Sequence, residues 1–469
     1  MSGFTNTYND EARLLTWLAR TIDNLKTAWR DIADNGDVKI AGPELDAKSE
    51  TDLANRMQEC IEGQGGEVSA RVRAARLGET YLHLNTKGRH RFLEIMATRF
   101  GHDLDKIDAA IDAYKSADSK ARLQSITALD AALQPPSIQL LTQFNALPQG
   151  VKFLVDMRQD LLRYRKESSE LMALDQTLEK LLGSWFDIGF LDMQRITWHS
   201  PASLLEKLVE YEAVHEIRSW TDLRNRLDSD RRLFAFFHPR MPTEPLIFVE
   251  VALVNGIAGS IQNLLDEDAP ALDPSLADTA IFYSISNTQA GLRGVSFGNF
   301  LIKQVAETLS NEFPNLKNFS TLSPIPGFTA WLKEAAADND GEDLLTPDDR
   351  KRFKKSGLTV PDIVSGKAWR ADPDRDEVAK PFLQRVCALY LLKIKKNGLP
   401  VDPVARFHLS NGAQIERINW MGDTSSKGLK QSCGMMVNYL YKLSDIEKNH
   451  ERFARDAHVT ASAAVKGLL

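Results

Sequence analysis

Two residues in the second half of the chain carry side chains that can hold and release protons. Ser323 lies in the stretch FSTLSPIPGF, where the following proline favours an extended backbone and a further proline and a glycine restrict the loop. His408 lies in ARFHLSNGAQ, and an imidazole gains or loses a proton near neutral pH. Each also has an ordinary explanation, because most serine-proline loops are turns and a lone histidine in an apolar run is more often a core residue.

Two other residues are weaker candidates for the same chemistry. Tyr441, in GMMVNYLYKL, can donate a hydrogen bond, although a buried tyrosine commonly finds a structural partner. His238, in FFHPRMP, ends a strand-like run before a proline, and this position favours a structural role. The stretch around Ser323 lacks the GxSxG pattern of a hydrolase nucleophile elbow. From these residues alone, Ser323 is either a reacting group or an ordinary loop residue.

A glycine-containing turn in SISNTQAGLRGVSFGNFLIK (284–303) is typical of a ligand-binding loop between a strand and a helix. Its three glycines, Gly291, Gly294 and Gly298, allow a close approach of the backbone. The helix N-terminus that follows offers free N–H groups and partial positive charge, which suit a pyrophosphate, and Arg293 adds a cation. The alternative is a turn that needs glycines for geometry alone.

The stretch RGVSFGNFLI, residues 293–302, resembles the RxxGxG pyrophosphate turn of the GNAT acetyltransferases, which binds coenzyme A in that family. Ser296 stands where the middle glycine of that turn is expected. The pattern is neither GxGxxG nor a Walker A loop, because the terminal lysine with serine or threonine is missing.

Four long blocks, taken together, resemble the malonyl-CoA decarboxylase family in their order and spacing. They span most of the second half of the chain. The blocks are HPRMPTEPLIFVEVALVNGIAGSIQNLL (238–265), AIFYSISNTQAGLRGVSFGNFLIK (280–303), FPNLKNFSTLSPIPGFTAWL (313–332) and DPVARFHLSNGAQIERINWMGDTSSKGLKQSCGMMVNYLYKL (402–443).

This resemblance implies that the chain converts malonyl-CoA to acetyl-CoA and carbon dioxide without a metal or an organic cofactor. It implies a catalytic pair, Ser323 and His408, supported by Tyr441 and Ser284. Animal members of the family carry an acid where this chain has a serine at 296, so any role of that acid does not transfer. The implied substrate-binding turn consists of Arg293, Gly294, Val295, Ser296, Phe297, Gly298 and Asn299.

Decarboxylation of a malonyl thioester leaves an electron pair on the α-carbon, delocalised into the thioester carbonyl as an enolate. Backbone N–H groups can stabilise the enolate oxygen, each by roughly 3–4 kcal/mol when preorganised. A positioned proton donor adds about 10²- to 10⁴-fold in rate, and His408 suits this role. Ser323 either binds the departing carboxylate or relays the proton, and the sequence does not choose between them.

The elements expected to position these residues divide the chain into two domains, with an α+β fold class. Residues 1–190 are predicted to form an all-helical bundle for scaffolding or oligomerisation, and 191–469 a GNAT-like mixed α/β catalytic domain. Strand-like runs lie at 232–239, 245–254, 279–288 and 317–323, with a helix at 299–313, whereas 405–420 mixes extended and turn signals. Helical patterns in the first part cover 10–34, 48–84 with a break at 63–66, 103–117, 119–133, 137–147 and 150–183.

The composition of the chain limits which partners it can bind and which cell compartment it suits. The 469 residues carry a net charge of −6, so no overall basic field recruits nucleic acid or an acidic membrane surface. No run of eighteen apolar residues predicts a membrane span, and the N-terminal stretch has no apolar signal core. Three cysteines without metal-binding spacing favour a reducing compartment, and the cytoplasm is predicted.

Two other functions stay open at this level. An acyl-CoA-dependent N-acyltransferase would rest on the glycine turn alone, and a non-catalytic CoA-binding or scaffold protein would rest on the large helical part. The predicted partners are malonyl-CoA and acetyl-CoA. A homo-oligomer, a dimer or a tetramer, is expected through the helical domain.

Overall fold

The protein consists of two compact units in a computed structural model. One unit comprises residues 1–192, 237–245 and 289–296, and the other comprises 193–236, 246–288 and 297–469. We call them the helical unit and the sheet unit. The structure describes residues 25, 27, 29, 32, 42–63, 66–186, 191–295, 301–337, 339–366, 369, 370 and 372–469.

The helical unit is held together by an aromatic core. Trp29, Tyr81 and Phe144 all pack edge-to-face against Phe153, with ring centroids 4.7–5.6 Å apart. Side chains of Asp46, Asn85, Asp103 and Ser168 begin four of its helices by accepting hydrogen bonds from backbone amides. Its helices are α2 (Ala47–Glu62), α3 (Gly66–His83), α4 (Thr86–Arg99), α5 (Leu104–Ser116), α6 (Arg122–Ala132), α7 (Ser137–Asn145), α8 (Gly150–Tyr164) and α9 (Ser169–Trp185).

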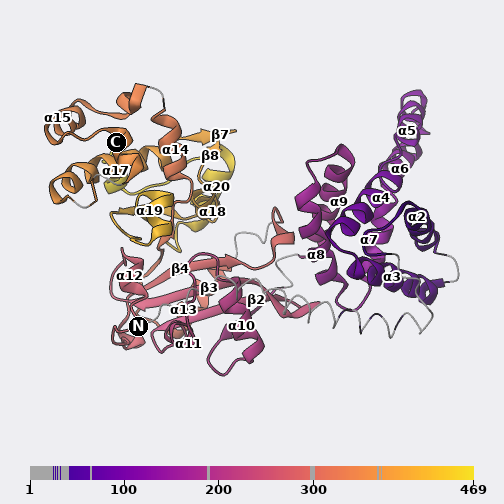
Figure 1. Ribbon diagram of the computed structural model, residues 1–469, viewed down its shortest axis with the longest axis horizontal. Helices are drawn as coiled ribbons and strands as arrows, with labels where there is room; N and C mark the ends of the chain where they lie inside the picture. Colours follow the sequence, from indigo (N-terminus) through magenta and orange to yellow (C-terminus); the bar gives the residue numbers. More distant parts are fainter. Residues whose placement is uncertain are drawn as a thin grey trace. The chain divides into compact units, whose positions relative to one another are not determined.

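Helices α5 and α6 form a hairpin that projects from the other helices of this unit (Figure 1). Neither helix contains a buried residue. Leu104 is 70% exposed and Leu123 is 75% exposed, so apolar side chains of the hairpin face water in the single chain.

The sheet unit is built on one eight-stranded mixed sheet with the order β1-β2-β3-β4-β5-β10-β6, in which β9 also pairs with β10. Its inner strands β2, β3 and β4 are buried along most of their length, as expected for strands covered on both faces. The strands are β1 (Asp192–Ile196), β2 (Arg231–His238), β3 (Met241–Val254), β4 (Thr279–Asn287), β5 (Asn318–Thr321), β6 (Ser323–Pro324), β9 (Gln414–Asn419) and β10 (Met436–Tyr441), with a small separate pair β7 (Lys395–Lys396) and β8 (Leu399–Pro400).

Strands β4 and β5 are parallel neighbours, and they separate along their length. Their pairing runs from Thr279 opposite Asn318 to Phe282 opposite Thr321, whereas β4 continues to Asn287. The register between β3 and β4 shifts next to Tyr283, which marks a β-bulge. The sheet therefore opens between β4 and β5 close to Ser323.

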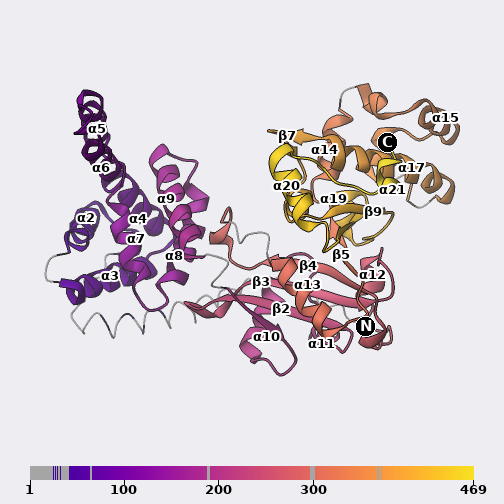
Figure 2. The same ribbon diagram turned by 180° about the vertical axis from the view of Figure 1, so that it is seen from behind.

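The helices of the sheet unit gather in two places, as both views show (Figures 1 and 2). The first group lies along β2, β3 and β4, and the second group lies on the side of the unit that contains β9 (Figure 2). The first group is α10 (Ala202–Tyr211), α11 (Trp220–Arg226), α12 (Ile261–Leu264) and α13 (Leu301–Glu312). The second group is α14 (Phe328–Ala335), α15 (Pro347–Ser356), α16 (Val360–Ser365), α17 (Pro373–Lys393), α18 (Pro403–Ser410), α19 (Ser426–Ser432), α20 (Ile446–Asp456) and α21 (Ala463–Lys466).

The predicted α+β class, a helical part followed by a mixed sheet with helices, is confirmed. The pattern analysis passed over α4, whose amphipathicity is interrupted by charged residues on several faces. It was also wrong for residues 405–410, which are helical in α18 rather than a mixture of extended and turn structure. Most of the helix predicted at 10–34 lies outside the described residues, although Leu25, Thr27, Trp29 and Ile32 are helical. The domain boundary near residue 190 stays a prediction.

Candidate active site

Ser323 begins the short strand β6, and only Leu322 separates it from the end of β5. It lies opposite Val437 of β10, so the sheet rather than a free loop fixes its backbone. Its side chain is 5% exposed. The sequence predicted Ser323 at a strand end, and the structure shows that this end is paired.

His408 is carried by the last turn of α18. Asp402 begins this helix by accepting hydrogen bonds from the amides of Val404 and Ala405 at 3.0 and 2.9 Å, and Pro403 occupies the first helical position. The helix ends before Gly412, whose φ of +82° favours glycine. His408 is 3% exposed. A short, strongly capped helix therefore holds a buried imidazole.

The structure brings three of the predicted site residues into one hydrogen-bonded chain. His408 Nε2 lies 3.2 Å from Ser323 Oγ, and His408 Nδ1 lies 2.7 Å from the Tyr441 hydroxyl. Both contacts are buried and join residues 85 and 33 positions apart in the sequence. The ring of Tyr439 stacks on the imidazole with centroids 4.5 Å apart, which leaves the ring little freedom to rotate.

Burial controls the charge of this chain. It lowers the pKa of His408 to about 3, and it raises the pKa of Tyr441 well above its ordinary value. Both side chains are therefore neutral at pH 7 in the free protein. A neutral imidazole donates a hydrogen bond through one ring nitrogen and accepts one through the other.

Thr321 belongs to this site, although the sequence analysis did not select it. Ser323 Oγ donates a hydrogen bond to Thr321 Oγ1 at 2.9 Å, and the backbone amide of Tyr439 donates to the same oxygen at 3.1 Å. The signal was present in the stretch STLS, because side chains two positions apart in an extended segment point to the same side.

Ser284 makes different contacts. Its hydroxyl lies 2.9 and 2.7 Å from the two carboxylate oxygens of Glu212, and Ser286 donates to the same carboxylate at 3.0 Å. Glu212 also accepts the amides of Val214 and His215. Ser284 thus anchors the opened half of β4 to the segment that follows α10. No sequence signal pointed to Glu212, which lies 72 residues from Ser284.

A second buried carboxylate lies on β3 opposite Ser284. Burial raises the pKa of Glu250 to about 8, and the nearby Glu212 adds to this effect. Arg226 opposes it, with Nη1 at 3.3 Å from Glu250 Oε2. Two acids and one arginine therefore lie under the β-bulge, where one carboxyl group keeps its proton near neutral pH.

Asp402 contacts the loop that follows Ser323 as well as its own helix. A Cβ on Gly327 would lie 2.4 Å from the Tyr390 hydroxyl and 3.6 Å from Asp402 Oδ2, so this position requires glycine. The Tyr390 hydroxyl donates to Asp402 at 3.4 Å, and the Gly327 amide stabilises the Asp402 carboxylate. Asp402 thus joins the segments that carry Ser323 and His408.

The predicted substrate-binding turn is described only in part. Arg293, Gly294 and Val295 belong to the helical unit, and Gly294 has a φ of +90°. The buried guanidinium of Arg158 donates to the carbonyls of Gly291 and Arg293 at 2.8 and 2.7 Å. Ser296, Phe297, Gly298 and Asn299 lie outside the described residues.

Arg158 is itself held by two acids. Its Nε lies 2.9 Å from Asp175, and its Nη2 lies 2.7 Å from Glu179. Four of the five guanidinium hydrogens therefore have partners on α9 or on the turn. This network fixes the backbone of the turn at Arg293.

His238 has a structural role in the helical unit. Its Nε2 lies 2.9 Å from the carbonyl of Trp185, and its Nδ1 accepts the amide of Arg240 at 3.2 Å. Burial lowers its pKa. Both ring nitrogens are thus engaged by the backbone, as the sequence position suggested.

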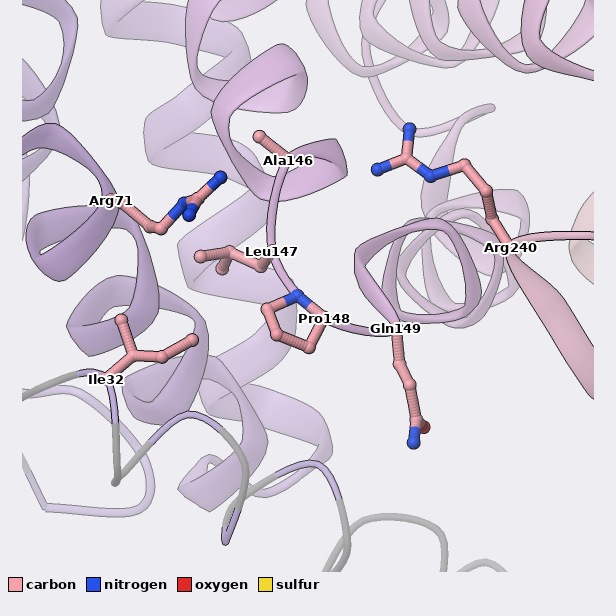
Figure 3. Close-up of a pocket in the computed structure, with 7 residues that line it drawn as sticks. All are labelled: Ile32, Arg71, Ala146, Leu147, Pro148, Gln149 and Arg240. Carbon is pink, nitrogen blue, oxygen red and sulfur yellow. The ribbon is translucent and has the colours of Figure 1, made fainter. Parts of the chain in front are cut away.

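The helical unit also contains an open surface pocket of about 400 Å³ (Figure 3). The guanidinium groups of Arg71 and Arg240 extend toward it from opposite sides. Arg240 is already bonded to the side chain and carbonyl of Asn145. The lining residues are Ile32, Arg71, Ala146, Leu147, Pro148, Gln149 and Arg240, none of which was predicted as a site residue.

Two features are absent from the described part of the chain. No group of three or more histidine, cysteine, aspartate or glutamate side chains is arranged to hold a metal ion there. Among the same residues, no helix has the length and apolar character needed to cross a membrane.

Comparison with known proteins covers both units. A family model described as the malonyl-CoA decarboxylase C-terminal domain matches residues 189–469, and one described as the malonyl-CoA decarboxylase N-terminal domain matches residues 100–186. Mitochondrial malonyl-CoA decarboxylase of Anser anser anser is 38% identical over 361 residues, which cover 74% of this chain and 71% of that protein. The corresponding protein of Rattus norvegicus is 38% identical over 370 residues, or 76% and 75% of the two chains.

Solved structures of malonyl-CoA decarboxylases are also similar to this chain over most of its length. The crystal structure of malonyl-CoA decarboxylase from Rhodopseudomonas palustris is similar with a TM-score of 0.81 and 41% identity, and the match covers 89% of this chain and 99% of that chain. The structure from Agrobacterium vitis is similar with a TM-score of 0.80 and 43% identity, over 89% and 99% of the chains.

Proposed function

The chain belongs to the malonyl-CoA decarboxylase family and converts malonyl-CoA to acetyl-CoA and carbon dioxide, and we propose that Ser323 and His408 handle the proton of this reaction. The observation that carries the proposal is the buried contact of 3.2 Å between Ser323 Oγ and His408 Nε2. Tyr441 supports the pair from the other side of the imidazole.

The proposed reaction has two bond changes. The bond between the carboxylate carbon and the α-carbon breaks, carbon dioxide leaves, and the electron pair passes to the α-carbon and the thioester oxygen. The enolate carbon then takes one proton from the Ser323–His408 pair and becomes the methyl group of acetyl-CoA. Water returns one proton to the pair. No covalent intermediate is needed, because the thioester carbonyl accepts the electrons.

The charge of His408 changes during the proposed reaction. Its pKa of about 3 in the free protein results from burial alone. A substrate carboxylate close to the imidazole favours its charged form, so binding of malonyl-CoA raises this pKa. His408 is thereby protonated when the substrate is present and returns to the neutral form after it has given its proton to the enolate.

We place the thioester oxygen near the opening between β4 and β5. Pairing of these strands ends at Phe282 and Thr321, so backbone groups of β4 beyond Phe282 have no partner on β5. Backbone amides that meet a developing negative charge are effective because they need no rearrangement during the reaction. Ser284 supports this segment by its bonds to Glu212.

The turn from Arg293 to Asn299 is the proposed binding site for the pyrophosphate of coenzyme A. Arg158 supports this assignment, because it holds the carbonyls of Gly291 and Arg293 and so turns the backbone in a defined direction. Ser296 contributes its backbone, since its side chain carries no charge.

The test is an assay of acetyl-CoA formation from malonyl-CoA. Ser323→Ala and His408→Ala are each expected to reduce kcat by about 10²- to 10⁴-fold. His199→Ala is the control, because this histidine is exposed on the sheet unit. Normal turnover in folded His408→Ala would refute the proposed proton donor. Transfer of an acyl group to an amine, without release of carbon dioxide, would instead favour an N-acyltransferase.

We also propose that the chain forms a homo-oligomer, a dimer or a tetramer, through the helical unit. The α5–α6 hairpin supports this, because Leu104 and Leu123 are exposed and neither helix contains a buried residue. Burial against a second copy would remove this apolar surface from water. Light scattering of wild type and of Leu104→Glu/Leu123→Glu tests the proposal, and an unchanged mass would reject this surface.

The proposed location is the cytoplasm. Cys60, Cys387 and Cys433 are free and buried, which agrees with a reducing compartment. The net charge of −6 gives no support for nucleic acid or an acidic membrane surface as a partner. The vertebrate relatives are named mitochondrial, so fractionation of cells that express the chain should compare these two compartments.

A further inference from the structure

The hydroxyl group of Thr321 has a defined place in the active-site chain of hydrogen bonds. Thr321 is 1% exposed, so its Oγ1 depends on protein partners. It accepts the Ser323 hydroxyl at 2.9 Å and the backbone amide of Tyr439 at 3.1 Å. An oxygen that accepts two hydrogen bonds has used both of its lone pairs.

The single proton of the Ser323 hydroxyl is directed to Thr321 by this arrangement. Ser323 Oγ therefore meets His408 Nε2 as an acceptor, and the 3.2 Å contact requires a proton on Nε2. A neutral imidazole has one N–H, so Nδ1 is bare and accepts the hydroxyl of Tyr441 at 2.7 Å. Burial keeps the phenol of Tyr441 protonated, which agrees with its role as donor.

The donors thus follow one direction along four residues, from Tyr441 through His408 and Ser323 to Thr321. Hydrogen bonds that run in one direction polarise and strengthen one another. The opposite direction would require Thr321 to donate to Ser323 and Nδ1 to carry the proton.

We propose that Thr321 is a positioning residue that accepts the Ser323 proton and thereby sets His408 in the tautomer with Nε2 protonated. The inference rests on the function proposed above for Ser323 and His408. Thr321 acts through Ser323 and does not need to touch the substrate. Its effect is to keep the nitrogen that faces Ser323 as a proton donor before malonyl-CoA binds.

Substitutions at Thr321, with a matched control, separate this role from simple packing. Thr321→Val keeps the shape and removes the oxygen, and Thr321→Ser keeps the oxygen and removes the methyl group. Thr279→Val is the matched control, because Thr279 is fully buried in the same sheet and its hydroxyl bonds Asp278 at 2.7 Å, away from the site residues. Thr321→Ala is a second variant without the oxygen. Ser323→Ala is measured beside them.

We expect Thr321→Val to lower kcat at least tenfold with KM for malonyl-CoA changed less than twofold. Thr321→Ser should keep kcat within threefold of wild type, and Thr279→Val should match wild type. The direct readout is ¹⁵N NMR of labelled histidine, with His408 assigned by its loss in His408→Ala. Wild type and Thr321→Ser should show protonated Nε2, and Thr321→Val should shift the proton to Nδ1.

The proposal fails if folded Thr321→Val or Thr321→Ala keeps kcat within twofold of wild type, or if the tautomer of His408 does not change. It also fails if both variants do not fold while Thr321→Ser is native, because Thr321 would then be needed for folding only. Full activity of Ser323→Ala would instead reject the function proposed for the pair. The two failures are therefore distinguishable.

Discussion

The hydroxyl of Tyr441 lies 2.7 Å from Nδ1 of His408, opposite the nitrogen that faces Ser323. Both nitrogens of this buried ring are engaged, and Tyr439 stacks on its face. The imidazole is therefore oriented before the substrate binds. Such preorganisation reduces the cost of aligning a proton donor at the moment of reaction.

Tyr441→Phe removes the hydroxyl that orients His408. We expect kcat to fall about tenfold or more with little change in KM, and stability to fall by about 1–3 kcal/mol, because buried Nδ1 loses its partner. Steady-state kinetics and urea unfolding measure the two effects.

Tyr439→Phe is the comparison for this change. The hydroxyl of Tyr439 has no hydrogen-bond partner among the described residues, and the substitution keeps the ring that stacks on His408. Its loss of kcat should be at most threefold. Equal losses in the two variants would contradict the role of the Tyr441 hydroxyl.

Stability should depend on pH through His408. Burial lowers its pKa from 6.5 to about 3 in the folded protein. The contribution of neutral His408 to stability is complete above pH 6.5. It decreases as the pH falls from 6.5 toward 3, because in this range only the unfolded chain binds the proton. Acidification from pH 7 to 5 should therefore lower the free energy of unfolding by about 2 kcal/mol through this one residue.

Urea unfolding at pH 7.5, 6.0 and 5.0 measures this dependence in wild type and in His408→Gln. On acidification, the variant should lose about 2 kcal/mol less stability than wild type loses. Burial also lowers the pKa of His215, to about 4. This histidine should therefore cause a similar loss of stability on acidification in wild type and in the variant. Identical slopes for the two proteins would show that His408 is not neutral in the fold.

Gly327→Ala tests the close contact between the Ser323 loop and Tyr390. A Cβ at 2.4 Å from the Tyr390 hydroxyl forces the loop or the tyrosine to move. We expect a loss of about 1–3 kcal/mol in stability, together with a lower kcat because Ser323 shifts relative to His408.

Gly183→Ala is the control for the glycine substitution. Gly183 lies in α9, and nothing lies within 4 Å of an added Cβ. Because alanine favours a helix over glycine, this variant should be more stable by about 0.5–1 kcal/mol and fully active. An unchanged thermal midpoint in Gly327→Ala would show that the loop is not tightly held.

Arg158→Lys should act on substrate binding rather than on the chemical step. Lysine cannot make the four separate bonds of the guanidinium, so the carbonyls of Gly291 and Arg293 lose donors. We expect KM to rise about tenfold with kcat within threefold, and stability to fall by about 3–5 kcal/mol, as when other buried ion pairs are broken.

Arg163→Lys provides the matched change on the same helix. Arg163 is 55% exposed and pairs only with Asp160 among the described residues, at 3.3 Å. Its kinetics and stability should equal those of wild type. A lower kcat with normal KM in Arg158→Lys would argue against the turn as a substrate-binding site.

The sequence allowed the residues of the proposed active site to be selected because they lie in long ordered blocks. Ser323, His408 and Tyr441 were selected from three stretches, and the fold joins them in one chain of contacts. Strands rich in apolar residues were also predictable, since burial on both faces leaves a clear pattern.

What the sequence could not show are partners fixed by tertiary structure. Glu212 meets Ser284 across 72 residues, and a lone glutamate after a helix carries no signal of this. Asp402 begins α18, but its contact with the Gly327 loop depends on how α17 and α18 pack. The helical state of residues 405–410 was hidden because the stretch 405–420 mixes extended and turn signals.

The bond between Arg158 and the carbonyl of Arg293 joins positions 135 residues apart. A ribosome adds about 5–20 residues per second, so roughly 7–27 seconds pass between the two during synthesis. For most of that interval the guanidinium can pair with Asp175 and Glu179, which follow 17 and 21 residues later, but not with the turn. The interior of the nascent helices is therefore complete only after a distant part of the chain has been synthesised.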